Sequence, residues 1–157
     1  MALHGARIQE RSTHGELIRE IRLDPVVGED PQHAIELSTG NLVVSFHART
    51  NDRQSEVRVV DPDGVILWSC RGGSGTPFST PKRLAIDRND HVFVADHQKN
   101  QVSVLSPTLT HLGYVDLSGY RLGDNNRKAL LCVHFDPLSR RLFVVGSGGE
   151  EIVILEA

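Results

Sequence analysis

The sequence predicts an all-β fold, namely a β-propeller segment built from four-stranded antiparallel blades. An apolar segment recurs at 41–45, 91–95 and 141–145, a period of about fifty residues that is typical of repeat architectures. Each copy follows a polar turn and precedes a second run of alternating apolar residues, which is the pattern of paired strands. Because the repeated unit contains strands alone, propeller blades are the architecture that fits it.

The clearest repeat spans residues 81–117 and is predicted to be a complete blade. Its four strands are expected at 84–87, 91–96, 101–105 and 111–117. Short polar side chains occupy the turn between the first two strands, where they tolerate a tight backbone.

The preceding repeat, residues 31–71, is predicted to be a second blade with the same strand order. Its strands are expected at 33–37, 41–47, 56–61 and 65–70. Before the last of these strands Pro62 fixes φ and Gly64 supplies a positive φ, which is strong turn chemistry. The loop at 48–54 is longer than its counterpart in the next repeat, and such insertions collect at functional surfaces.

Partial blades are predicted at both ends, over 6–23 and 129–157. The first of them offers third and fourth strands, and the second offers first, second and third strands at 131–136, 141–146 and 152–155. Joined, the two ends complete a blade, which gives about three blade equivalents, or half of a six-bladed ring, whereas closed propellers have about four to eight blades.

Unmatched strands at both ends predict self-association, because open edges and apolar blade faces attract other strands. The residues expected at these edges are Ile8, Leu17, Ile18, Ile21, Ile152 and Ile154. Two chains arranged head to tail would close a ring. The sequence leaves open two alternatives, namely missing blades in an upstream part of a longer chain and an open-ended polymer.

Composition places the chain among ordinary soluble proteins. Of its 157 residues 39% are hydrophobic and 24% charged, and the net charge of −3 gives no overall attraction to nucleic acid. Cys70 and Cys132 are expected to be reduced core residues. We expect a cytoplasmic protein with no membrane partner, because no signal peptide and no apolar run of about 18 residues is present.

Residues 72–117 resemble an NHL repeat. A glycine-rich approach ends in Phe78 and Pro81, and the segments 84–87, 92–96 and 100–104 match the strand, turn and Asp–Asn signature of that family. The repeat at 31–71 fits more loosely. The resemblance implies a six-bladed propeller that acts as a protein- or RNA-binding scaffold, as in tripartite-motif ubiquitin ligases. The zinc-binding and coiled-coil parts of those ligases have no counterpart here.

Nothing in the sequence predicts catalysis, a metal site or a cofactor. The histidines show no metal-ligand spacing, no serine lies in a nucleophile elbow, and the glycines at 72–75 lead into a strand instead of a phosphate-binding helix. The chain is therefore predicted not to be an enzyme.

The most suggestive charges lie in loops that one face of the propeller shares. The basic residues expected there are Arg49, Arg53, Lys82, Arg83, His97, Lys99, Arg127 and Lys128. We expect this loop face to bind a protein partner. Single-stranded RNA is the alternative ligand, since basic side chains contact phosphates, and a self-assembling structural role is a further one. Trp68 and Phe78 are expected to pack between blades.

Overall fold

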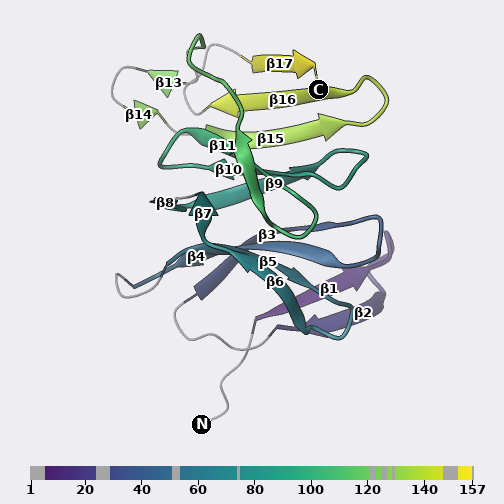
Figure 1. Ribbon diagram of the computed structural model, residues 1–157. Coiled ribbons are helices and arrows are strands. Elements are labelled where there is room, and N and C mark those ends of the chain that lie inside the picture. Colours follow the sequence, from purple (N-terminus) through teal and green to yellow (C-terminus); the bar gives the residue numbers. More distant parts are fainter. Residues whose placement is uncertain are drawn as a thin grey trace.

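The computed structural model describes residues 6–23, 29–50, 54–73, 75–120, 123–124, 127–128, 130–146 and 152–156. All regular structure in these ranges is β-strand (Figure 1). The described residues contain no helix long and apolar enough to span a membrane.

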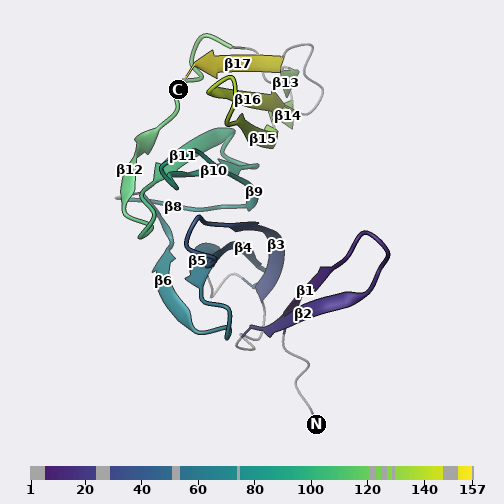
Figure 2. The same ribbon diagram turned by 90° about the vertical axis from the view of Figure 1, so that its right-hand side faces the viewer.

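Three antiparallel sheets form the body of the molecule, and they lie one above another in both views (Figures 1 and 2). The first sheet contains β3 (Glu29–Glu36), β4 (Leu42–Ala48), β5 (Glu56–Val60) and β6 (Ile66–Cys70). The second contains β9 (Pro81–Ile86), β10 (Val92–Asp96), β11 (Gln101–Leu105) and β12 (His111–Tyr114). The third contains β15 (Leu130–Asp136), β16 (Arg141–Gly146) and β17 (Ile152–Glu156). In each sheet the strands pair in chain order, as in a meander.

Three short hairpins accompany the sheets. They are β1 (Arg7–Arg11) with β2 (Leu17–Arg22), β7 (Gly72–Gly73) with β8 (Thr76–Pro77), and β13 (Gly123–Asp124) with β14 (Arg127–Lys128). The β1–β2 hairpin projects from the end of the stack below the first sheet (Figure 2).

The hairpin turns share one hydrogen-bond pattern. In the turn before β6, Gly64 N–H donates to Asp61 O at 3.0 Å, and the Asp61 carboxylate accepts from two further backbone N–H groups. The turn before β10 repeats this with Asp90 and Asp87. The residue that donates has a positive φ in both, 88° at Gly64 and 60° at Asp90, which explains why glycine or aspartate occupies it.

The cores lie between the sheets, because successive side chains of a strand point to opposite faces. In β10, Val92 and Val94 pack toward the first sheet, whereas Phe93 and Ala95 pack toward the third. A smaller core lies between the first sheet and the β1–β2 hairpin, with Ile21 at its centre.

The predicted all-β architecture of antiparallel meanders is confirmed, but several details differ. Strand β3 begins at Glu29, four positions before the expected 33, and the glycine-rich linker contains the β7–β8 hairpin. Phe78 is buried between sheets as predicted, with 6% of its surface exposed. The same prediction for Trp68 was wrong: its side chain is 42% exposed, because it lies on the outer strand of the sheet, beyond the neighbouring sheet's reach.

Candidate functional site

Most of the basic loop residues that the structure describes contact their own chain. Arg49 forms an ion pair with Asp30, which raises the pKa of Arg49 through a hydrogen bond and through its charge. Lys99 donates to the carbonyl of Pro77, and His97 Nδ1 lies 2.9 Å from the carbonyl oxygen of Leu130. These contacts hold loops together, so the three side chains are less available to a ligand than the sequence suggested.

Of the other predicted loop-face residues, only Lys82 and Arg83 have side chains among the described residues. Lys82 is half-buried and Arg83 is exposed, both at the start of β9. Arg53 lies outside the described residues. Arg127 and Lys128 form β14, and their side chains lie outside the described part of the chain. Binding of protein or RNA by the loop face stays a prediction.

Asp96 connects the loops of the second sheet from a fully buried position. Its carboxylate accepts hydrogen bonds from the backbone N–H groups of Ser79, at 2.7 Å, and Thr80, at 2.9 Å. Ser55 in the first sheet's long loop donates to the carbonyl of Ser79 at 2.8 Å. These hydrogen bonds connect the loops of the first and second sheets, and Asp96, which directly follows the recurring segment at 91–95, has a structural role there.

His33 lies on the innermost strand of the first sheet, facing the second. Its Nδ1 accepts a hydrogen bond from the backbone N–H of Leu84 at 3.3 Å. Burial, followed by the nearby charge of Arg83, lowers the pKa of this histidine. The ring accepts this hydrogen bond across the junction of the two sheets, which is a packing role.

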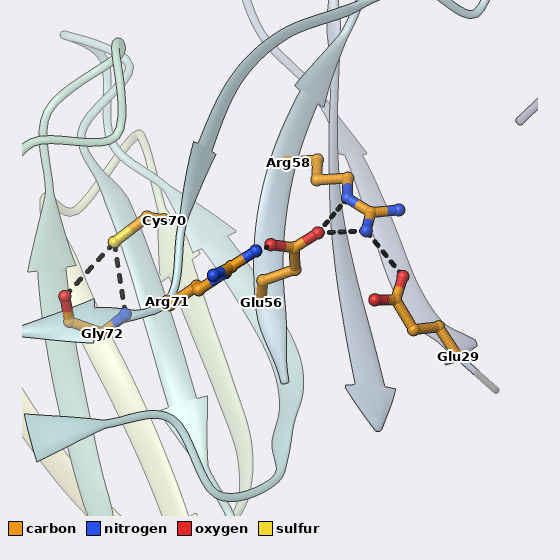
Figure 3. A network of polar contacts seen from close by, with 6 residues as sticks. All are labelled: Glu29, Glu56, Arg58, Cys70, Arg71 and Gly72. Carbon is orange, nitrogen blue, oxygen red and sulfur yellow. Dashed lines mark hydrogen bonds and ion pairs between the residues drawn. The ribbon is translucent and has the colours of Figure 1, made fainter. Parts of the chain in front are cut away.

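A buried charged cluster in the first sheet escaped the sequence analysis (Figure 3). The Arg58 guanidinium contacts Glu56 and donates to Glu29 Oε2 at 2.6 Å, and all three side chains are at most 7% exposed. Arg58 also lies over the Phe46 ring, 4.5 Å from its centroid. Arg71, itself exposed, approaches the other Glu56 oxygen at 3.3 Å.

The sequence contains one signal for this cluster, because Glu56 and Arg58 are charged residues that alternate with valines in an otherwise apolar strand. It contains no such signal for Glu29, which belongs to a strand that begins earlier than predicted. Cys70 lies nearby, at the end of β6 (Figure 3), where burial raises the pKa of its thiol. Both cysteines are free, as the sequence predicted, but they are half-buried and not the fully buried core residues that were expected.

The described residues contain no group of three or more His, Cys, Asp or Glu side chains placed to hold a metal ion.

The most distinctive surface is one face of the third sheet, which we call the open end face. It consists of Phe143, Val145, Ile152 and Ile154, which pair across β16 and β17 as Phe143 with Ile154 and Val145 with Ile152. Ile152 is 64% exposed and Ile154 51% exposed. Within the described residues no strand pairs with the outer edge of β17.

The same positions are covered in the other two sheets. By strand pairing, the first-sheet counterparts are Val43, Ser45, Val57 and Val59, all with 0% of their surface exposed. The second-sheet counterparts are Phe93, Ala95, Val102 and Val104, of which the first three are at most 7% exposed and the last is partly buried. The open end face thus repeats, at the end of the stack, a surface that is buried at each internal junction.

The predicted edge residues divide into two groups. Ile21 is buried at 2% exposure and Ile8 packs beside it, both against the first sheet. Leu17 is 51% and Ile18 61% exposed, toward the tip of the β1–β2 hairpin. Within the described part of the chain the two ends of the stack therefore differ: a hairpin covers one end, and at the other Ile152 and Ile154 are more than half exposed.

No protein-family model and no curated protein matches the chain. Several solved structures share its fold. A protein of unknown function from Bacteroides caccae is 17% identical with a TM-score of 0.53, over 95% of this chain and 53% of that chain. Virginiamycin B lyase from Staphylococcus aureus is 11% identical with a TM-score of 0.53, over 96% and 48% of the two chains. A streptogramin B lyase is 15% identical with a TM-score of 0.53, over 96% and 47%.

These similarities define the chain as β-propeller in fold, and they do not support the NHL repeat in particular. The chain spans about half the length of the solved structures that it matches. The prediction that the chain is not an enzyme, made because the sequence lacks catalytic motifs, is contradicted by these neighbours. The virginiamycin B lyase of the same fold is an enzyme, although the low identity demonstrates a shared fold and not a shared activity.

Proposed function

We propose that the chain is a protein-binding propeller segment whose open end face receives the first sheet of a second copy. The observation that carries this proposal is the repetition described above: the positions of Phe143, Val145, Ile152 and Ile154 are buried by a neighbouring sheet at each internal junction. Exposed apolar patches on an otherwise polar surface mark sites of association.

A second copy suits this face because the chain already contains the complementary surface. At the internal junctions, the face that covers these positions is contributed by Val92 and Val94 of the second sheet and by Leu142 and Val144 of the third. The corresponding residues of the first sheet are Leu42, Val44 and their neighbours, which are likewise apolar and which the β1–β2 hairpin contacts in the single chain. The solved propellers are about twice as long as this chain, so two copies supply a comparable number of residues.

The expected gain from burying the exposed isoleucines is appreciable. Full burial of such a side chain contributes about 1.5–3 kcal/mol, and roughly half of each surface is still exposed. Ile152 and Ile154 therefore add about 1 kcal/mol each, in addition to the partly covered Phe143 and Val145.

Light scattering during gel filtration, over a range of protein concentrations, tests the proposal. The unaltered chain should reach twice its monomer mass of 17.3 kDa. Ile154→Lys should stay monomeric, because it places a charge in the centre of the contact. Leu138→Lys is the matched control: Leu138 is 87% exposed, in the turn between β15 and β16 and away from the face, so the variant should associate normally.

A monomer mass at every concentration would refute the proposal. So would an Ile154→Lys variant that associates as well as Leu138→Lys.

A further inference from the structure

The β1–β2 hairpin has the register of a blade's outer two strands. Ile8 lies opposite Ile21 and, beyond a bulge, Arg11 lies opposite Leu17. The same pairs occur 49 residues further along the chain between β5 and β6, where residue 57 lies opposite 70 and residue 60 lies opposite 66, and the bulge lies at the equivalent place. Strands β11 and β12 have this bulge too, next to the pair of residues 105 and 111. The hairpin therefore corresponds to third and fourth strands.

Strand β2 also packs on the first sheet much as β6 packs on the second. Ile21 belongs to the core formed with Leu42 and Val44. Its counterpart in β6, Cys70, packs against the core between the first and second sheets. The end of β2 further lies against the turn before β6, where an added Cβ on Gly64 would meet a backbone oxygen of β2 at 2.2 Å.

A complete blade at this position would also contain first and second strands beside the hairpin, and the described residues do not supply them. Four strands of the second sheet face the first sheet on its other side, but only two strands of the hairpin face it here. A cleft of about 270 Å³ lies between the hairpin and the first sheet, and both apolar and polar side chains line it: Ile8, Gln9, Glu10, Arg19, Ile21, Ala34, Ile35, Glu36 and Leu42. Among the described residues the third sheet has the opposite composition, with first, second and third strands and without a fourth.

Strands β1 and β17 both hold the third position of a blade, and β17 is better suited to it. In β1 only Ile8 is apolar, and the other residues are Arg7, Gln9, Glu10 and Arg11. In β17 four consecutive residues are apolar, and Val153 is 3% exposed in the core with the second sheet. A β17 strand beside β2 would bury more apolar surface than β1 does.

We propose that β17 of the second copy replaces β1 beside β2, so that two chains build one sheet in the order β15, β16, β17, β2. This inference rests on the proposed function and adds the strand contact to it. In the shared register Ile152 lies opposite Ile21 and Leu155 opposite Leu17, where Ile8 and Arg11 lie in the single chain. The exchange gives β17 a partner strand that the described residues of the single chain do not supply, and it places the partner's β15 and β16 beside β17 on the first sheet.

A reversible lock of β1 on β2 tests the exchange. In a Cys70→Ala, Cys132→Ala background, Ile8→Cys with Ile21→Cys places two thiols on directly opposite residues of an antiparallel pair, within reach of a disulfide. The oxidised variant should show a dissociation constant at least ten-fold higher than its background protein, and reductant should restore association.

A second experiment does not depend on the double variant folding. A copy carrying Ile21→Cys is mixed with a copy carrying Ile152→Cys, in the same cysteine-free background, and oxidised. Covalent dimers should contain one copy of each kind, as mass spectrometry of the crosslink would identify. Ile18→Cys in place of Ile21→Cys is the matched control and should crosslink several-fold less.

The outcomes separate the two proposals. If the locked protein associates as its background does, or the mixed copies fail to crosslink while light scattering shows dimers, the strand exchange is refuted and docking at the open end face stands. If the unaltered chain does not associate, the proposed function fails and the exchange fails with it.

Discussion

Removal of the Arg58 guanidinium should destabilise the protein more than any exposed charge does. The cation lies between Glu29 and Glu56, and these three side chains are at most 7% exposed. Arg58→Met keeps the length and much of the volume of the side chain, but it removes the cation from the buried Glu29 carboxylate and leaves buried Glu56 with the exposed Arg71 alone. Breaking a buried ion pair in this way costs about 3–5 kcal/mol.

This loss is a large share of the total, since domains of this kind unfold with about 5–15 kcal/mol. Arg71→Ala provides the matched control. Arg71 contacts the same Glu56 carboxylate, but its side chain is 69% exposed, and exposed pairs contribute about 0–1 kcal/mol. The triple replacement Glu29→Leu, Glu56→Leu, Arg58→Met should recover most of the stability, because apolar side chains need no charge compensation.

Urea unfolding, followed through the fluorescence of the single tryptophan, measures these differences. Trp68 lies in β6 of the same sheet and is half-exposed, so its emission should report the loss of that sheet. The reasoning is refuted if Arg58→Met loses less than about 1 kcal/mol, or no more than Arg71→Ala loses.

Two further predictions concern the turn geometry and the junction between sheets. Gly64→Ala should lower the free energy of unfolding, measured in urea, by about 1–3 kcal/mol more than Gly15→Ala does. Both glycines have a φ near +87°, but only at Gly64 would the new Cβ collide with backbone atoms. Equal losses would contradict this close approach. Stability should decline as pH falls below the ordinary histidine value of 6.5, because the lowered pKa of His33 means that the folded state binds its proton less readily than the unfolded state. His33→Gln, which keeps an acceptor, should reduce this decline in unfolding curves measured from pH 7.5 downward, and an unchanged pH profile would contradict the assignment.

Most of the architecture could be predicted because the repeat is encoded in local patterns. Strand alternation, the turn residues around Asp61 and Asp87, and the spacing of about fifty residues each report on a few neighbouring residues. They therefore predicted the order of strands in each sheet. They could not predict that Trp68 is exposed, because its exposure depends on how far the adjacent sheet extends.

The candidate sites could be predicted only in part. The terminal isoleucines were recognised as edge residues because the strand count at each end was uneven. The charged cluster was missed because Glu29 and Arg58 are far apart in sequence and meet only through the pairing of strands. Lys82 and Arg83 were predicted in a loop but lie in β9, and nothing in the sequence indicated that Arg49, His97 and Lys99 contact their own chain.

The sequence by itself determined the repeat, the strand order and the mismatch between its ends, because each is a periodic property of neighbouring residues. Only the tertiary structure decided which apolar faces are covered. Burial depends on what packs against a strand from elsewhere in the chain, so identical positions such as Val43, Phe93 and Phe143 differ in exposure. The open end face is a consequence of that difference: its residues follow the core pattern, and no sheet of the described chain lies against them.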